Sequence, residues 1–184
     1  MLTRAVYILK EIEDEAKHEF LPILGPDKGK ILADAVRKAN PKHVLEIGTL
    51  IGYSAILIGR GLEAEAEITT IEIHTDEAKA AEENIRRSQI LPNVNVIVGD
   101  AVRLIPTLKN CFDAVFIDAE KTEYYTYLQL MEDKLNSGAV VVADNAGIFA
   151  NQMKDFLDYV RYSGKYKSQF IRVGEDGLEI SVKL

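Results

Sequence analysis

One segment of the chain reads Val44-Leu45-Glu46-Ile47-Gly48-Thr49-Leu50-Ile51-Gly52-Tyr53-Ser54. Residues 44–47 form a short β-type run, and Tyr53 begins a helical pattern that continues to Gly59. Gly48 and Gly52 lie between the two, where glycine lets the backbone turn sharply and approach a ligand. The segment therefore predicts a strand, a nucleotide-type loop and a helix, in that order.

The same alternation continues along the chain. Further strands are predicted at residues 68–73, 94–98, 114–117 and 139–143, and helices at 76–87, from 101, around 124–135 and at 153–162. Apolar strands separated by helices indicate an α/β fold with a doubly wound, Rossmann-like, mostly parallel sheet. The last two runs, 168–173 and 178–182, have Asp176-Gly177 between them as a turn signal, which predicts a C-terminal antiparallel hairpin.

The first forty residues precede this pattern. Residues 3–19 carry apolar side chains at helical spacing, and Asp27 is placed to cap a second helix. With 184 residues and no linker or repeat, the chain is expected to form a single domain over 1–184, with N-terminal helices in 1–40 and the core sheet in 41–184.

Composition excludes several classes of protein. The chain has 22 Lys and Arg against 29 Asp and Glu, a net charge of −7, so it does not attract nucleic acid or an anionic membrane as a whole. No apolar run approaches the roughly 18 residues that span a bilayer, and no secretory leader is apparent, so a cytoplasmic protein is expected. The single cysteine, Cys111, precedes the apolar run at Phe112 and is predicted to be a packed residue rather than a nucleophile.

Ligands of open α/β sheets bind beyond the carboxyl ends of the strands. Glu72 ends the second strand, where a carboxylate can accept hydrogen bonds from both ribose hydroxyls; a solvated charge is the alternative. Asp100 follows the third strand and can hold an adenine amine, cap a helix, or both. The loop is not a dinucleotide fingerprint, because Leu50 replaces the middle glycine that would admit a pyrophosphate.

Three oxygen-bearing side chains follow the fourth and fifth strands. Asp118 ends the fourth strand, and Asp144 and Asn145 end the fifth. Carboxylate and amide oxygens are ligands that Mg²⁺ accepts, and no cysteine or histidine is placed beside them to favour zinc. Two neighbouring carboxylates repel unless a cation lies between them, so the pattern predicts a magnesium-type site; helix capping is the structural alternative.

Taken in order, these residues resemble the metal-dependent O-methyltransferases that use S-adenosylmethionine, a family that includes catechol and caffeoyl-CoA O-methyltransferases. The resemblance covers most of the chain. The matching segments are 24–29 (Leu24 to Gly29), 44–48, 52–54, 71–73, 98–101, 116–121 with Tyr124, and 143–145.

The resemblance implies a role for each matching residue. The methyl donor, S-adenosylmethionine, would be bound by Glu46, Gly48, Gly52, Ser54, Glu72, Asp100, Ala101 and Asp118. A divalent cation such as Mg²⁺ would be held by Asp118, Asp144 and Asn145. Lys121 would be the catalytic base.

The implied reaction is methyl transfer to a vicinal diol or catechol-like small molecule, by a protein expected to be a homodimer. The chain has no tryptophan, so it lacks the aromatic gate and the adenine-side tryptophan of the catechol enzyme, and Ala119-Glu120 is similar to the caffeoyl-CoA and bacterial branch. Arg172 suggests that the acceptor differs in charge from the acceptor of the catechol enzyme. Two alternatives stay open: a hydroxyuridine in transfer RNA as acceptor, or a nucleotide-binding protein or NAD-dependent oxidoreductase that transfers no methyl group.

Overall fold

A computed structural model describes residues 3–184. One sheet of seven strands runs through it in the order β3-β2-β1-β4-β5-β7-β6. Strands β1 to β5 pair in parallel, and β7 is antiparallel to both of its neighbours. The strands are β1 (His43–Ile47), β2 (Glu67–Glu72), β3 (Asn93–Val98), β4 (Phe112–Ile117), β5 (Leu135–Ala143), β6 (Tyr166–Val173) and β7 (Asp176–Lys183).

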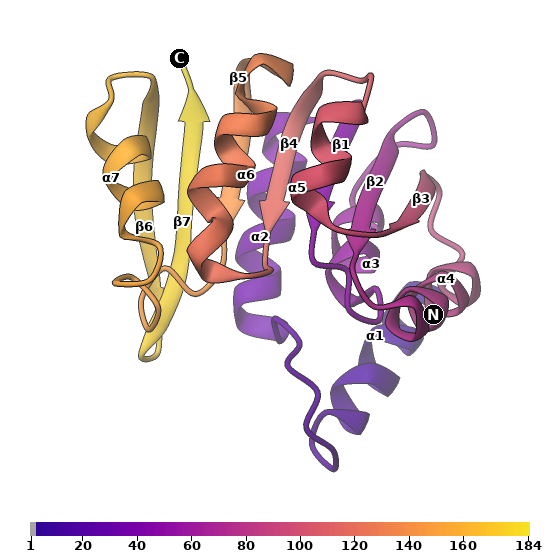
Figure 1. Cartoon of the computed structure of the whole chain (residues 1–184). Coiled ribbons are helices and arrows are strands. Elements are labelled where there is room, and N and C mark those ends of the chain that lie inside the picture. The colour runs from indigo at the N-terminus through magenta and orange to yellow at the C-terminus, as the bar shows by residue number, and fades with distance from the viewer. Residues whose placement is uncertain (1–2) are drawn as a thin grey trace.

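Helices cover both faces of the sheet (Figure 1). Those in front in Figure 1 are α5 (Ala101–Leu104), α6 (Tyr124–Met131) and α7 (Lys154–Tyr162). The other helices are α1 (Arg4–Glu15), α2 (Pro26–Ala39), α3 (Tyr53–Gly59) and α4 (Thr75–Ser88). Short 3₁₀ turns at Ile105–Thr107, Lys121–Glu123 and Glu132–Lys134 flank α5 and α6. The predicted Rossmann-like sheet, its N-terminal helices and its C-terminal hairpin are confirmed.

Each face of the sheet has its own apolar core. On one face, Val115 and Ile117 of β4 pack with α6 and α7. On the other, Ala114 and Phe116 of the same strand pack with α1, α2 and α3. Successive side chains of a strand point to opposite faces, so a strand buried on both faces must be apolar throughout. This requirement explains the continuous apolar runs in the sequence.

Two helix predictions need correction at the N-terminus. The first helix ends at Glu15 rather than Glu19, because residues 17–20 are exposed and bury no apolar face. Asp27 does not cap the second helix. Gly25, with φ of 77°, is the N-cap, and Pro26 is the first helical residue, a position where proline's fixed φ suits the helix and its missing N–H costs nothing.

Two single residues also differ from their predictions. Asp176 and Gly177 are the first residues of β7, and the hairpin turn is instead made by Gly174, with φ of 60°, and Glu175. Cys111 is exposed, not packed, because the buried apolar run begins one residue later at Phe112. Within residues 3–184, no helix is long and apolar enough to cross a membrane.

Candidate active site

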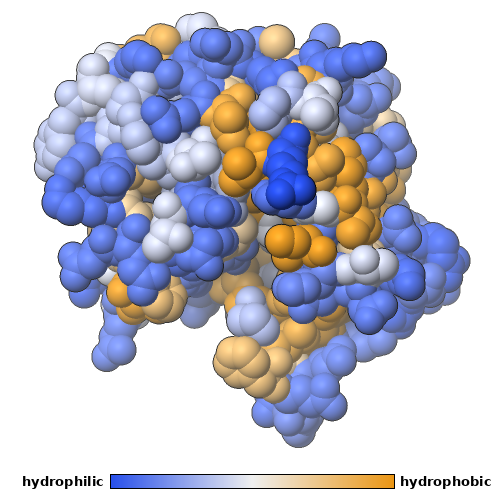
Figure 2. Space-filling model, in the orientation of Figure 1, coloured by the Kyte–Doolittle hydropathy of each residue, from blue (hydrophilic) through white to orange (hydrophobic). Residues whose placement is uncertain are grey.

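A cavity of about 840 Å³ lies at the carboxyl ends of the parallel strands. Its far wall is the connection between α1 and α2, which contributes Phe20, Ile23 and Leu24 and extends below the sheet in Figure 1. Figure 2 shows the face on which α5 to α7 lie, with apolar surface exposed around α5 and the adjoining strands. The predicted site residues that line the cavity are Gly48, Ser54, Glu72, Asp100, Ala101, Asp118, Lys121, Asp144 and Asn145.

The glycine loop between β1 and α3 forms one wall. Gly48 has φ of 94° and donates its N–H to the carbonyl of Ile71 at 3.0 Å, which holds the loop against β2. Leu50 also has a positive φ, 48°, a backbone conformation that residues other than glycine rarely adopt. Gly52, with φ of 87°, does not line the cavity; its α-carbon faces the backbone of Ala81. Gly52 therefore contributes to the turn of the loop on the side away from the cavity, where the loop packs against α4.

Glu72 at the end of β2 is 5% exposed, so it is not a solvated charge. Its Oε2 accepts the N–H of Leu50 at 2.7 Å, and its Oε1 accepts the N–H of His74 at 3.0 Å. The carboxylate thus fixes the glycine loop and the start of α4 while it lines the cavity. Each oxygen retains a lone pair for a further donor.

Glu46 lies beneath this wall rather than on it. The side chain is fully buried, its Oε2 accepts the hydroxyl of Thr70, and its Oε1 has no hydrogen-bond partner within residues 3–184. Burial raises the pKa of Glu46 to about 7, against the opposing effect of the Ser54 and Thr70 hydroxyls. Of the predicted donor-site residues, Glu46 and Gly52 do not line the cavity.

Asp100 caps α5, as one of its two interpretations predicted. Its Oδ1 accepts the N–H of Val102 at 2.8 Å, and its side chain is about four-tenths exposed toward the cavity. The second carboxylate oxygen, Oδ2, lies 3.5 Å from Nε of the exposed Arg103, a weak surface ion pair that a ligand can replace, so the two interpretations of Asp100 are compatible.

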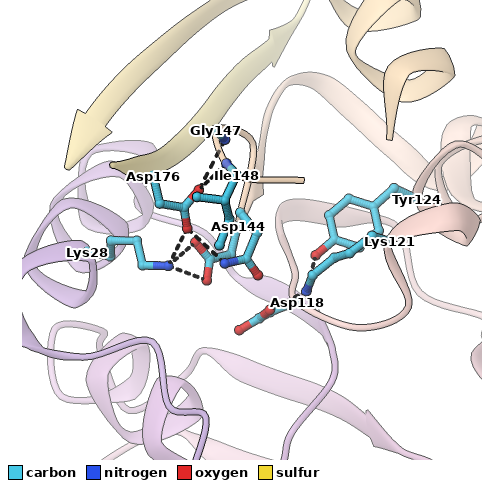
Figure 3. A network of polar contacts seen from close by, with 9 residues as sticks. Lys28, Asp118, Lys121, Tyr124, Asp144, Gly147, Ile148 and Asp176 are labelled. Atoms are coloured by element: carbon cyan, nitrogen blue, oxygen red, sulfur yellow. Dashed lines mark hydrogen bonds and ion pairs between the residues drawn. The ribbon is translucent and has the colours of Figure 1, made fainter. Parts of the chain in front are cut away.

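Asp118 and Lys121 form a close pair at the end of β4. The ammonium of Lys121 donates to Asp118 Oδ1 at 2.9 Å and to the hydroxyl of Tyr124 at 3.1 Å (Figure 3). The 3₁₀ turn at residues 121–123 brings Lys121 back beside Asp118. Burial, and then the charge of Asp118, raise the pKa of Tyr124 well above its usual value, so its hydroxyl keeps its proton.

A second charged cluster lies beside the first, at the end of β5. Lys28 of α2 donates to both oxygens of Asp144, at 2.7 and 2.8 Å, and to Asp176 at 3.0 Å (Figure 3). Burial, and then the charge of Asp118, raise the pKa of Asp144 to about 6. Burial acts to lower the pKa of Lys28, but the hydrogen bonds and charges of the two carboxylates outweigh it and raise the pKa.

Sequence reasoning missed three residues of this region. Phe20, almost fully exposed, provides an aromatic side chain at the cavity rim although the chain has no tryptophan. Lys28 lies in the matching segment 24–29, so its position was available as a signal, but no role was given to it. Asp176 was interpreted only as part of a turn, and no local pattern indicates that it reaches Lys28.

Comparison with known proteins identifies the family of the chain. The profile of a family described as O-methyltransferase matches residues 3–161. The chain belongs to the O-methyltransferase family. Catechol O-methyltransferase B of Danio rerio is 36% identical over 191 residues, covering 96% of this chain and 72% of the relative. Catechol O-methyltransferase of Mycobacterium tuberculosis is 38% identical over 119 residues, covering 64% and 54%.

Solved structures of O-methyltransferases have the same fold. One from Bacillus cereus, in complex with SAH, is 26% identical with a TM-score of 0.86, covering 97% of this chain and 91% of that one. TomG from Streptomyces achromogenes, in complex with SAM, is also 26% identical, with a TM-score of 0.84 and coverage of 96% and 89%. The expected resemblance to the catechol and caffeoyl-CoA type is confirmed at the level of the family.

Proposed function

We propose that the protein transfers a methyl group from S-adenosylmethionine to a hydroxyl of a small molecule that carries two vicinal oxygens, with the help of a divalent cation. One observation carries the proposal: strand-end carboxylates and Lys121 line the same cavity as the glycine loop and Glu72. A nucleoside-type subsite and a hard-cation subsite thus adjoin each other, as a reaction between a nucleoside-bearing donor and an oxygen nucleophile requires.

The donor subsite is assigned to the wall formed by the glycine loop, Glu72 and Asp100. Glu72 is buried and lines the cavity with its carboxylate, so a ribose diol would find two directed acceptors. When bound, S-adenosylmethionine supplies the methyl group, which leaves its sulfur as the bond to the acceptor oxygen forms. The chain's contribution is chiefly to hold donor and acceptor in line, because methyl transfer needs no covalent enzyme intermediate.

The cation subsite is assigned to Asp118, Asp144 and Asn145. Their donors are all oxygens, the set that Mg²⁺ prefers. Burial, and then the charge of Asp118, raise the pKa of Asp144, and a bound cation would relieve both the burial cost and the repulsion. When bound, the cation would favour the ionised form of an acceptor hydroxyl.

Lys121 is assigned as the base. In its unprotonated form its Nζ can take the hydroxyl proton, and Asp118 and Tyr124 orient it from 2.9 and 3.1 Å.

The small-molecule acceptor is favoured over transfer RNA by the charge of the cavity. Among residues 3–184, two lysines, Lys28 and Lys121, line the cavity, and no arginine does. The carboxylates that line it are more numerous: Glu72, Asp100, Asp118, Glu120, Glu123 and Asp144. Such an excess of negative charge repels a phosphate backbone. The relatives named catechol O-methyltransferases support an acceptor with vicinal hydroxyls.

Two measurements test the proposal. Calorimetry should give binding of S-adenosylmethionine and S-adenosylhomocysteine but not of NAD, and NAD binding alone would favour the oxidoreductase alternative. Turnover should then be assayed with catechol, caffeoyl-CoA and transfer RNA, with and without a chelator. We expect a diol to be methylated only with Mg²⁺ or a similar ion, while donor binding survives chelation. Full turnover after exhaustive chelation would contradict the metal requirement.

A further inference from the structure

Both carboxylate oxygens of Asp176 accept hydrogen bonds from groups that surround the proposed cation subsite. It begins β7, which enters the sheet beside β5 in the opposite direction. Its Oδ1 accepts the N–H groups of Gly147 and Ile148, both at 3.1 Å. Its Oδ2 accepts Asn145 Nδ2 at 2.8 Å. The same oxygen accepts Lys28 Nζ at 3.0 Å (Figure 3). One carboxylate thus holds the loop after β5, a proposed ligand, and a lysine.

The bond to Asn145 fixes which way its amide faces. An ionised carboxylate can only accept hydrogen bonds, so the nitrogen of the Asn145 amide must face Asp176 and the oxygen must face away from it. The oxygen is the atom that a hard cation binds. Asn145 also has a left-handed backbone, with φ of 61°, which asparagine tolerates better than most residues.

The position of Lys28 adds a second constraint. Its ammonium contacts both oxygens of Asp144, a side chain that is almost fully buried. A divalent cation that binds Asp144 would therefore have to share or displace this lysine. Asp176 is the other carboxylate within reach of the same ammonium, at 3.0 Å. Lys28 can consequently release Asp144 without becoming a buried charge that lacks a partner.

We propose that Asp176 is a positioning residue of the cation subsite: it turns the oxygen of Asn145 toward the cavity and retains Lys28 when a divalent ion takes Asp144. This inference rests on the proposed metal dependence. It assigns Lys28 the opposite role, that of a resident cation that competes with the metal for Asp144.

The test is Mn²⁺ binding to the donor-free protein, measured by calorimetry and by electron paramagnetic resonance. Asp176→Asn should raise the Kd for Mn²⁺ by about 10- to 100-fold, the usual effect of losing a group that orients a ligand. Lys28→Gln should lower the Kd, because a competing charge is removed. In the Asp176→Asn background, Lys28→Gln should lower the Kd for Mn²⁺ by a larger factor than in the wild type. Once Asp176 is replaced, Asp144 is the only one of the two carboxylates left to pair with Lys28.

Asp113→Asn is a matched control. Asp113 lies near the amino end of β4 and accepts the N–H groups of Lys42 and His43, at 2.9 and 3.1 Å, and Asn136 Nδ2 at 2.7 Å. The Asp113→Asn variant therefore loses a similar set of hydrogen bonds far from the cavity, and we expect its Kd for Mn²⁺ to equal that of the wild type.

The outcomes separate the two proposals. A wild-type protein that binds no Mn²⁺ would overturn the metal dependence, and the inference with it. A wild type that binds Mn²⁺, together with a folded Asp176→Asn variant of unchanged Kd, would overturn the inference alone. Equal weakening by Asp113→Asn would also overturn it, because the effect would then reflect general loosening of the fold.

Discussion

The α-carbon of Gly48 faces the backbone carbonyl of Asp118 so closely that an added Cβ would lie 2.1 Å from its oxygen. Asp118 in turn donates its N–H to the carbonyl of Ile47 at 2.9 Å. The glycine loop after β1 and the residue after β4 are therefore joined by close backbone contacts. A change in one must displace the other, which links the donor wall of the cavity to the cation subsite.

Replacing Gly48 with alanine should be costly for this reason. A left-handed backbone costs a non-glycine residue about 1 to 2 kcal/mol, and relief of the clash with Asp118 adds to this. We expect Gly48→Ala to lose at least about 3 kcal/mol of unfolding free energy in urea. Gly138→Ala is the control, since Gly138 has φ of 82° but no atom near an added Cβ, and should lose only the backbone cost. Equal losses in the two variants would contradict the close contact.

The Glu72→Gln variant tests the donor wall. Glutamine keeps the shape of the side chain but offers one accepting oxygen, so it cannot hold Leu50, His74 and a ribose diol as the carboxylate can. Affinity for S-adenosylmethionine should fall by about 2 kcal/mol, measured by calorimetry. Glu67→Gln, at the exposed opposite end of β2, should leave affinity unchanged. If Glu72→Gln binds the donor as the wild type does, Glu72 is not in the subsite.

Lys121 is tested by paired substitutions. Lys121→Ala should lower kcat by about 100- to 10,000-fold, the range typical of general-base loss, while affinity for S-adenosylmethionine stays within a few-fold. Arginine should not restore activity, because guanidinium keeps its proton over the accessible pH range. Lys79→Ala, on the exposed face of α4, is the control. Near-normal kcat in Lys121→Arg at neutral pH would end the assignment as base and leave a role in orientation or charge.

Glu46 makes stability depend on pH in a direction opposite to that of a salt-bridged carboxylate. Burial raises its folded pKa to about 7 from 4.5, so between these values the folded state keeps a proton that the unfolded state has lost. The contribution of Glu46 to the free energy of unfolding is therefore fully present below pH 4.5. It falls by about 3 kcal/mol in total as the pH rises to 7 and beyond. The Glu46→Gln variant, compared with wild type by urea unfolding at several pH values, should lack this loss. Parallel curves for the two proteins would refute the buried, protonated state.

The sequence predicts the strands, and which residues lie at their carboxyl ends, because both have local causes. The apolar run at 114–117 must be buried on both faces wherever it lies, and Asp118 must follow it. The contacts of Lys28 and Asp176 have no local cause, since Lys28 meets Asp144 across 116 positions and Asp176 across 148. Their contact depends on β7 entering the sheet between β5 and β6, which no local pattern encodes.

The place of β7 in the sheet also sets an order of events during synthesis. Residues 176–183 leave the ribosome after β5, β6 and all the side chains that line the cavity, yet in the folded sheet they lie between β5 and β6. The nascent chain can pair β1 to β5 in advance, but Lys28 then has only Asp144 as an acidic partner until Asp176 emerges. Synthesis of β7 thus completes the charge balance of the site, and a stalled chain that stops short of residue 176 would lack the second acidic partner of Lys28.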